Sequence, residues 1–228
     1  MEPISRAIAP NDRMFEGDGY DPERYFAMGR QAVELVRRYC DSPGRILDFG
    51  CGHGRVMRWL AAEYPEAELW GCDVNLDGVR FCEQEFGARG IVSSPDPNKI
   101  TLPRCDLIWV GSVFTHLPLE SWRSFLRLLA DSLDGVLAFS TAGRQIADAL
   151  RGGERVGIGE RGPEVVREYD ETGFAFSDYL NTDTPGFGYT LTSPARSASE
   201  VQSAGLRFVA HHESAWMRQD VVIARNPR

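Results

Sequence analysis

Three alternating glycines stand directly after a short apolar run in the segment ILDFGCGHG, residues 46–54. Glycines at the carboxyl end of a strand let a ligand approach the backbone closely, and the next helix turns its first N–H groups toward the same place. Asp73 follows the last of these glycines by nineteen residues and ends the next apolar run. Because a carboxylate in that position accepts hydrogen bonds from both hydroxyls of a ribose, the spacing predicts a site for an adenosine-containing ligand.

The glycine spacing separates this loop from two other nucleotide-binding loops. A dinucleotide fingerprint GxGxxG that starts at Gly50 needs glycine where Arg55 stands, and one that starts at Gly52 needs glycine where Met57 stands. A Walker loop needs Gly-Lys-Ser/Thr, which the segment lacks. A nicotinamide-dependent oxidoreductase is therefore disfavoured, and the remaining alternative is a glycine-rich turn that binds nothing.

The loop needs a strand before it and a helix after it, and the chain supplies this alternation from residue 45 to residue 140. Such alternation predicts a doubly wound α/β fold, in which right-handed crossovers give a parallel sheet with helices on both faces. Two further strands near the C-terminus lie so close in sequence that they must pair antiparallel. We expect strands at 45–49, 68–72, 90–93, 106–110, 135–140, 206–215 and 220–224, and helices at 22–40, 55–63, 77–86, 119–133 and 197–204.

A chain of 228 residues, 43% of them hydrophobic, is long enough for one domain with a sizeable core. We predict a single domain over 1–228, in which residues 1–20 form a flexible arm or a flap that orders on contact. Residues 143–195, with a weak helix at 163–171, form an insertion that caps the substrate, and the alternative is a solvated irregular loop. Its candidate substrate contacts are the aromatic residues Phe174, Phe176, Tyr179, Phe187 and Tyr189, with Trp216, and the acidic residues Asp170, Glu171, Asp178 and Asp183, which favour a polar or cationic acceptor.

The charge balance of 25 basic and 33 acidic residues gives a formal net charge of −8. A charge of this sign argues against a nucleic-acid partner and against a polybasic membrane patch. No apolar run approaches the roughly 20 residues that span a bilayer, no apolar leader opens the sequence, and the five cysteines have no CxxC spacing. We expect a soluble cytoplasmic protein with reduced thiols and no membrane partner, and the sequence carries no signal for an oligomeric state.

At the glycine loop and Asp73 the chain resembles the class I S-adenosylmethionine-dependent methyltransferases. Their first motif, an acidic residue followed by G-x-G-x-G, matches Asp48 through Gly54, and their second, an acidic residue that ends the second strand, matches Asp73. The resemblance implies a Rossmann-like seven-stranded sheet, mostly parallel with an antiparallel C-terminal hairpin, and S-adenosylmethionine as cofactor. The segments ILDFGCGHGRV, CDLIWVGSVFTHLP, GYTLTSP and QDVVIA also resemble bacterial methyltransferases found with glycan or secondary-metabolite biosynthesis genes.

The resemblance implies which positions bind the cofactor. The glycine loop would hold its methionine portion, the ends of the second and third strands its ribose and adenine, and the end of the fourth strand its sulfonium. Tyr25 or Arg30, both on the first long helix, would close over the cofactor, and the alternative for Tyr25 is packing of the helix. The implied cofactor-binding residues are Tyr25, Asp48, Gly50, Cys51, Gly52, Asp73, Val74, Asn75, Ser94, Asp96, Gly111 and Ser112.

Methyl transfer to oxygen or nitrogen needs an aligned acceptor and, where the acceptor carries a proton, a base. His116 is the candidate catalytic base, because it follows the fourth strand at the edge where doubly wound sheets bind ligands, and because imidazole titrates near neutral pH. The alternative is a histidine that starts a helix and bonds to the backbone or the cofactor. His53 is interpreted as part of the glycine loop, and the adjacent His211 and His212 face opposite sides of a strand. None of these histidines has metal-site spacing with the cysteines, so we expect no metal.

The sequence therefore predicts an S-adenosylmethionine-dependent methyltransferase that acts on oxygen or nitrogen of a small molecule, such as a sugar or a secondary metabolite. One alternative is a cofactor-binding protein of the same fold that has no catalytic activity and serves as a scaffold or regulatory partner. A nucleic-acid methyltransferase lacks support, because no basic stripe and no recognition domain are visible. A protein acceptor stays open on the same grounds.

Overall fold

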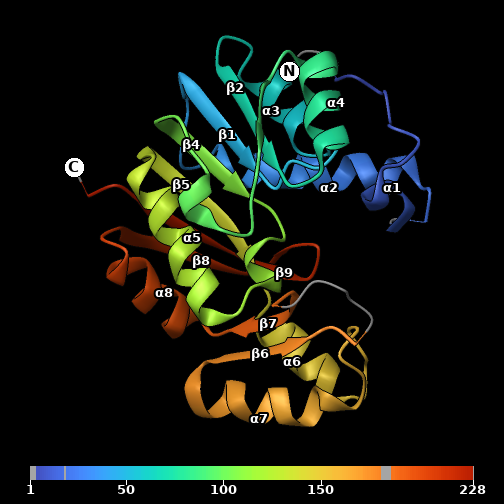
Figure 1. Ribbon diagram of the computed structural model, residues 1–228, viewed down its shortest axis with the longest axis vertical. Coiled ribbons are helices and arrows are strands. Elements are labelled where there is room, and N and C mark those ends of the chain that lie inside the picture. Colours follow the sequence, from blue (N-terminus) through green and yellow to red (C-terminus); the bar gives the residue numbers. More distant parts are fainter. Residues whose placement is uncertain (1–3, 18, 181–185, 228) are drawn as a thin grey trace. The chain divides into compact units, whose positions relative to one another are not determined.

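A computed structural model describes residues 4–17, 19–180 and 186–227 of the chain (Figure 1). Seven strands form one sheet in the order β3-β2-β1-β4-β5-β9-β8, and β6 and β7 form a second, two-stranded sheet. In the large sheet the pairs β1–β2, β1–β4 and β2–β3 are parallel, whereas β8 and β9 pair antiparallel. The predicted doubly wound, Rossmann-like sheet with its antiparallel C-terminal hairpin is confirmed.

The chain divides into two compact units, of which the first comprises Met1–Gly111 and Asp131–Leu137. Its central strands β1 and β4 are almost wholly buried, and most of their buried residues are apolar, as expected for strands covered on both faces. The elements of this unit are α1 (Arg13–Gly17), α2 (Pro22–Val36), β1 (Arg45–Phe49), α3 (Met57–Glu63), β2 (Glu68–Asp73), α4 (Leu76–Phe86), β3 (Arg89–Val92), the 3₁₀ helix η1 (Pro97–Lys99) and β4 (Cys105–Val110).

Capping residues explain where two helices of the first unit begin. The Asp21 carboxylate accepts hydrogen bonds from the first backbone N–H groups of α2, and Pro22 occupies the first helical position. This helix ends at Val36 rather than at residue 40 as predicted, because the chain tightens into turns such as the Arg38 N–H to Leu35 carbonyl bond. The Asn75 side chain caps α4 in the same way as Asp21 caps α2.

The described part of the N-terminal segment contains a short helix and contacts two other helices. Residues 13–17 form α1, and the Asp12 side chain accepts hydrogen bonds from the N–H groups of Met14 and Phe15 at its start. The Ser5 hydroxyl donates to Glu85 of α4, and the Arg6 guanidinium lies 4.9 Å from the centre of the Phe26 ring. The segment is thus in contact with α2 and α4, while both a flexible arm and a flap that orders on contact stay predictions.

The second unit comprises Ser112–Ala130 and Ala138–Arg228, so that β5 begins in the first unit and ends in the second. Helix α5 buries Trp122, Phe125, Leu126 and Leu129. The rings of Phe114, Trp122 and Phe139 pack with their centres 4.6–5.6 Å apart. The elements of this unit are the 3₁₀ helix η2 (Phe114–His116), α5 (Leu119–Asp131), β5 (Leu133–Thr141), α6 (Arg144–Arg151), the 3₁₀ helix η3 (Gly159–Arg161), α7 (Gly162–Thr172), β6 (Phe174–Asp178), β7 (Gly188–Thr192), α8 (Pro194–Ser203), β8 (Arg207–Trp216) and β9 (Gln219–Arg225).

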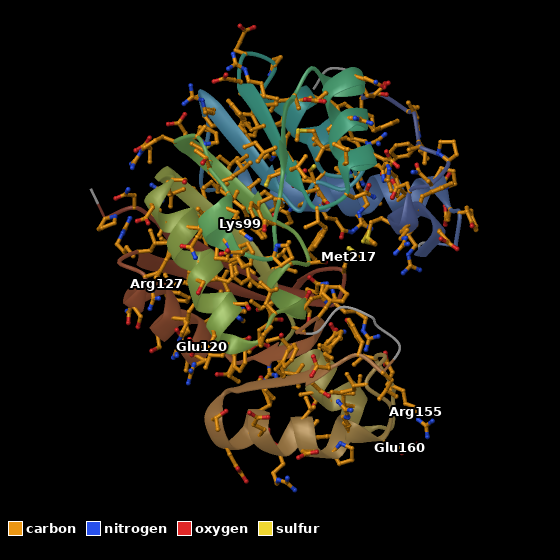
Figure 2. The ribbon with its side chains drawn as sticks, viewed as in Figure 1. Lys99, Glu120, Arg127, Arg155, Glu160 and Met217 are labelled. Carbon is orange, nitrogen blue, oxygen red and sulfur yellow. The ribbon has the colours of Figure 1, made fainter. Side chains whose placement is uncertain are left out.

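The insertion over 143–195 is more regular than predicted. Strands β6 and β7 pair antiparallel, and Figure 1 shows α6 and α7 packed beside them. Apolar side chains from these four elements form one buried cluster that includes Ile146, Leu150, Val165 and Leu191. Arg155 and Glu160, labelled in Figure 2, form an ion pair on the surface of the connection before α7. The insertion therefore has its own core and is not a solvated irregular loop.

The C-terminal hairpin turns at Met217 and Arg218, which both have positive φ angles of 52° and 65°. A two-residue turn with this backbone matches the twist of antiparallel strands. Met217 is labelled in Figure 2 at this turn. Within the described residues, no helix is long and apolar enough to cross a membrane.

Candidate cofactor and catalytic site

The glycine loop leaves β1 in a conformation that requires glycine. The φ angles of Gly50, Gly52 and Gly54 are 84°, 49° and 75°, a region that L side chains rarely adopt. The Gly50 N–H donates to the Cys72 carbonyl at 2.7 Å, which fixes the start of the loop to β2. A Cβ atom on Gly78 would lie 2.4 Å from the Gly52 carbonyl oxygen, so the first turn of α4 also packs directly on the loop.

Asp73 uses both carboxylate oxygens to order the loop. Its Oδ2 accepts the Gly52 N–H at 2.7 Å, and its Oδ1 accepts the Asn75 N–H at 2.8 Å. Each carboxylate oxygen has a second lone pair, and the side chain is half-buried rather than enclosed. Asp73 therefore retains the capacity to accept two hydroxyl hydrogen bonds from a ribose.

The surroundings of Asp73 fit an adenosine-containing cofactor. Apart from Gly52 and its two chain neighbours, no described residue has an atom within 4 Å of the place that a Cβ on Gly52 would take, which leaves room for a ligand against the loop backbone. Three apolar side chains near Asp73 in the chain or the sheet register are exposed: Val74 (66%), Leu76 (42%) and Val92 (54%). An exposed apolar surface beside a hydrogen-bonding carboxylate suits a flat base attached to a ribose.

Asp48 is a buried carboxylate in front of the glycine loop, and its Oδ2 atom has no hydrogen-bond partner among the described residues. Burial raises the pKa of this group to about 7, and the negative charge of Asp73 adds to the rise. The positive charge of Arg55 and a backbone hydrogen bond from Met57 act in the opposite direction. Asp48 is therefore poised to change its charge near neutral pH, close to the loop.

Arg58 is a residue of this region that the sequence did not reveal. The side chain is 1% exposed, and it donates to the carbonyls of His53 and Gly54 at 3.3 and 3.0 Å. It also donates to the carbonyls of Ser5 and Ala7 at 3.0 and 2.8 Å. Its guanidinium further lies 5.3 Å from each of three ring centres, those of Tyr25, Phe26 and Phe86. A cation on α3 normally points to solvent, whereas this one joins the glycine loop to the N-terminal segment.

Two other predicted cofactor residues are in the interior of the first unit. Tyr25 is fully buried, and its hydroxyl donates to Asp12 at 2.6 Å. These contacts agree with the interpretation in which Tyr25 packs the helix. A contact of Tyr25 with the cofactor stays a prediction. Cys51 is buried inside the loop. All five cysteines belong to the described residues and are free thiols, as predicted.

Ser94, Asp96 and Asn75 take part in local turns. The Ser94 hydroxyl accepts the Asp96 N–H, and the Asp96 carboxylate accepts the Asn98 N–H at the start of η1. The Asn75 oxygen caps α4. These bonds shape the segments after β2 and β3, and contact of the three residues with the cofactor stays a prediction.

Gly111 closes the first unit after β4, and Ser112 opens the second. Ser112 has a positive φ of 57° and is held in this conformation from two sides. Its N–H donates to the Ser140 hydroxyl at 2.7 Å, and its own hydroxyl lies 2.9 Å from the Gln219 amide nitrogen. Gln219, from the start of β9, is a second residue that sequence reasoning missed.

His116 is surrounded by the insertion. Its Nδ1 atom lies 3.0 Å from the Gly188 carbonyl oxygen and 2.8 Å from the Tyr179 hydroxyl. The ring centres of Tyr179, Phe187 and Tyr189 lie 5.8, 5.0 and 6.2 Å from that of the imidazole. Burial lowers the pKa of His116, and the Gly188 carbonyl opposes this shift, so the imidazole is neutral at pH 7. The structure thus brings together His116 and three of the predicted aromatic residues, while Asp183 lies outside the described residues.

The other histidines lie apart from this cluster. His53 is buried in the glycine loop with its Nδ1 3.8 Å from Asp12. On β8 the side chain of His211 is buried with its Nε2 3.4 Å from Asp220, whereas His212 is half-buried. Among the described residues, no group of three or more His, Cys, Asp or Glu side chains is arranged to hold a metal ion.

Residues 46–134 match the family model described as a methyltransferase domain. In its fold the chain is similar to the Burkholderia thailandensis 1,6-didemethyltoxoflavin-N1-methyltransferase, with a TM-score of 0.63, 14% identity, and coverage of 99% of this chain and 95% of that chain. The family match over residues 46–134 and the shared fold support a class I S-adenosylmethionine-dependent methyltransferase, with S-adenosylmethionine as its cofactor.

Curated relatives match only part of the chain and act on different acceptors. A trans-aconitate 2-methyltransferase from Methylobacterium nodulans is 33% identical over 46% of this chain and 40% of its own length. The ribosomal RNA small subunit methyltransferase C of Vibrio vulnificus is 33% identical over 29% of this chain and 19% of its own length. The chain spans less than half of the length of the relatives it matches.

Proposed function

We propose that this protein transfers a methyl group from S-adenosylmethionine to an oxygen or nitrogen atom of a small molecule, such as a sugar or a secondary metabolite. The observation that carries the proposal is the glycine loop ordered by Asp73, with open space at Gly52 and exposed apolar side chains beside it. This arrangement supports binding of the cofactor of its enzyme class.

The residues of the first unit would hold the cofactor. Backbone groups of Gly50, Cys51 and Gly52 bind its methionine portion, Asp73 accepts from the ribose hydroxyls, and Val74 contacts the base. When bound, the cofactor supplies a methyl group on a positively charged sulfur, which makes that carbon reactive toward nucleophiles. The chain's contribution to the reaction is then to orient the acceptor, exclude water and remove a proton.

His116 would take that proton. A neutral, half-buried imidazole has a free basic nitrogen at pH 7, and the aromatic residues around it exclude water. The insertion over 143–195 would cap the acceptor, because its strands β6 and β7 carry Tyr189 and reach the segment that contains His116. Asp170, Glu171 and Asp178 of the insertion would favour a polar or cationic acceptor.

The charge of the chain favours a small acceptor over a nucleic acid. A nucleic-acid substrate is bound mainly through its phosphates by clustered cations, and the net charge of −8 works against this. Several arginines of the insertion already pair with carboxylates, for example Arg151 with Asp170. The match to ribosomal RNA methyltransferases covers less of the chain than the match to trans-aconitate methyltransferases.

The test has two stages. Isothermal titration with S-adenosylmethionine and S-adenosylhomocysteine measures cofactor binding, and the absence of binding would overturn the proposal. Incubation of the protein and methyl-labelled cofactor with fractionated extract of its native host then identifies the labelled product. Binding without any labelled product would instead favour the non-catalytic scaffold or regulatory protein of the same fold.

A further inference from the structure

Both polar neighbours of the His116 Nδ1 atom come from the insertion. Gly188 opens β7 and Tyr179 directly follows β6, so the two-stranded sheet supplies the carbonyl at 3.0 Å and the hydroxyl at 2.8 Å. The Thr190 hydroxyl of β7 also donates to the Leu117 carbonyl at 2.7 Å. Two successive residues, His116 and Leu117, are therefore hydrogen-bonded to β7.

The carbonyl decides which imidazole nitrogen carries hydrogen. A carbonyl oxygen only accepts hydrogen bonds, so its contact with Nδ1 is attractive only if Nδ1 bears a hydrogen atom. A hydroxyl can accept from that same N–H, whereas a bare Nδ1 would point its lone pair at the carbonyl oxygen. The form with hydrogen on Nδ1 therefore satisfies both the Gly188 and the Tyr179 contacts, and its Nε2 carries the lone pair.

The position of the carbonyl is set by the close approach of β6 and β7. A Cβ atom at Gly188 would lie 2.1 Å from the Ser177 carbonyl oxygen, so any other residue would push the two strands apart. Asp178 and Gly188 are register partners in this sheet, which places Tyr179 just beyond the pair. Gly188 thus allows the close approach of the two strands, and this approach determines where its carbonyl oxygen lies relative to His116.

We propose that the Gly188 carbonyl and the Tyr179 hydroxyl hold His116 as the Nδ1–H tautomer, which leaves the Nε2 lone pair to accept a proton from the methyl acceptor. Only the proton transfer rests on the proposed function. In that step the O–H or N–H bond of the acceptor breaks, its hydrogen joins Nε2 as a proton, and the bonding electrons stay on the acceptor atom that takes the methyl group. The imidazolium keeps its Nδ1–H bonds and later releases the Nε2 proton to water. Tyr179 is a positioning residue, because it acts through His116.

The tautomer can be read directly by NMR of the full chain labelled with ¹⁵N-histidine, titrated over pH without cofactor or acceptor. We expect hydrogen on Nδ1 and none on Nε2 in neutral His116, whose signals are identified by their loss in His116→Ala. The titratable side chains in contact with the ring, Tyr179 and Tyr189, are phenols whose pKa is raised by burial, so neither titrates together with it. Hydrogen on Nε2, or an average of the two tautomers, would overturn the proposal.

Tyr179→Phe tests the direction of the second hydrogen bond. If the hydroxyl accepts from Nδ1–H, it stabilises the imidazolium most, so its removal lowers the pKa of His116 by about 0.7. If it instead donates to a bare Nδ1, its removal raises the pKa, and a rise or no change would overturn the role of Tyr179. Tyr189→Phe is the matched control, a phenol in the same aromatic cluster, and we expect the same tautomer in it.

Gly188→Ala tests the carbonyl itself. We expect loss of the single tautomer, because the added Cβ displaces β7 from β6. Persistence of the Nδ1–H form in a folded Gly188→Ala protein would show that the carbonyl does not select it, which overturns the proposal. Once an acceptor is known, Tyr179→Phe should lower kcat about fivefold at pH 7, the factor that corresponds to the pKa change of about 0.7. Failure to find any methyl transfer would refute the proposed function but not the tautomer, while an Nε2–H signal would refute the tautomer alone.

Discussion

The hydrogen bonds that position the functional groups join residues at very different separations along the sequence in the two units. In the first unit the Gly52 N–H bonds to Asp73, 21 residues away, and Arg58 bonds to the Gly54 carbonyl, four residues away. In the second unit His116 bonds to partners 63 and 72 residues away, and Ser112 to one 107 residues away. The glycine loop is thus ordered by the strand–loop–helix unit that contains it, whereas His116 depends on the insertion.

This difference predicts that the proposed cofactor binding and the proposed proton transfer are separable in this protein. Changes in the insertion should alter His116 and leave the glycine loop intact, since the loop has its partners within the first unit. Changes at Asp73 should instead alter the glycine loop and leave His116 intact.

His116→Ala should have the largest effect. General base catalysis contributes 10²–10⁴-fold, so we expect kcat to fall about 1000-fold while the affinity for S-adenosylhomocysteine stays unchanged. In the unsubstituted protein kcat should fall as the pH drops below the lowered pKa of His116, because the base must be neutral to accept a proton. Labelled methyl transfer across pH measures both, with His212→Ala as control. Unchanged turnover at every pH would remove His116 as the base.

Arg58→Met should have the next largest effect, on stability. Its removal takes away the side-chain hydrogen bonds to four backbone carbonyls, of which, within the described residues, only that of Gly54 keeps a helical N–H donor, and we expect the free energy of unfolding to fall by about 3 kcal/mol. Urea denaturation measures this, and Arg30→Ala, which removes only an exposed i,i+4 pair with Glu34, should change it by less than about 0.5 kcal/mol. Equal effects of the two changes would contradict the joining role of Arg58.

Asp73→Ala should weaken cofactor binding and spare His116. Loss of the carboxylate removes the acceptor of the Gly52 N–H and the proposed ribose acceptor, which corresponds to about a 100-fold rise in Kd for S-adenosylhomocysteine. Isothermal titration measures the affinity, and the ¹⁵N signals of His116 should stay in place. Asp77→Ala, an exposed carboxylate in the first turn of α4, is the control. A disturbed His116 would show that the two units are not separable.

Asp48→Asn should have the smallest effect, seen as a change in the pH dependence of stability. The folded-state pKa of Asp48 is about 7 and lies above the unfolded value of about 3.9, so the folded protein binds more protons between these values. Its contribution to stability is complete below pH 4 and is lost as the pH rises through 7. The advantage of Asp48→Asn should therefore grow by about 2 kcal/mol from pH 5 to pH 8. Parallel curves for the two proteins would contradict this, and the exposed Asp131→Asn is the control.

The same difference in reach explains what the sequence could predict. Asp48, the glycine loop and Asp73 stand in one strand–loop–helix–strand pattern, so their spacing alone indicates the geometry. Helix α6 and strands β6 and β7 were not predicted, because the insertion has short elements separated by glycine and acidic residues and no sustained period. The Tyr179 contact with His116 joins residues that share no pattern, and Arg58 is a cation within a short amphipathic helix, where burial has no sequence signal.

The hydrogen bond from His116 to Gly188 involves a main-chain oxygen, which every amino acid possesses. Side chains elsewhere on β6 and β7 can therefore be exchanged without removing this support for the imidazole, provided that position 188 stays glycine. If His116 is the base and the insertion binds the acceptor, as proposed, a library with randomised positions on these strands would sample new acceptors and keep the base. Acceptor choice would then evolve independently of proton transfer.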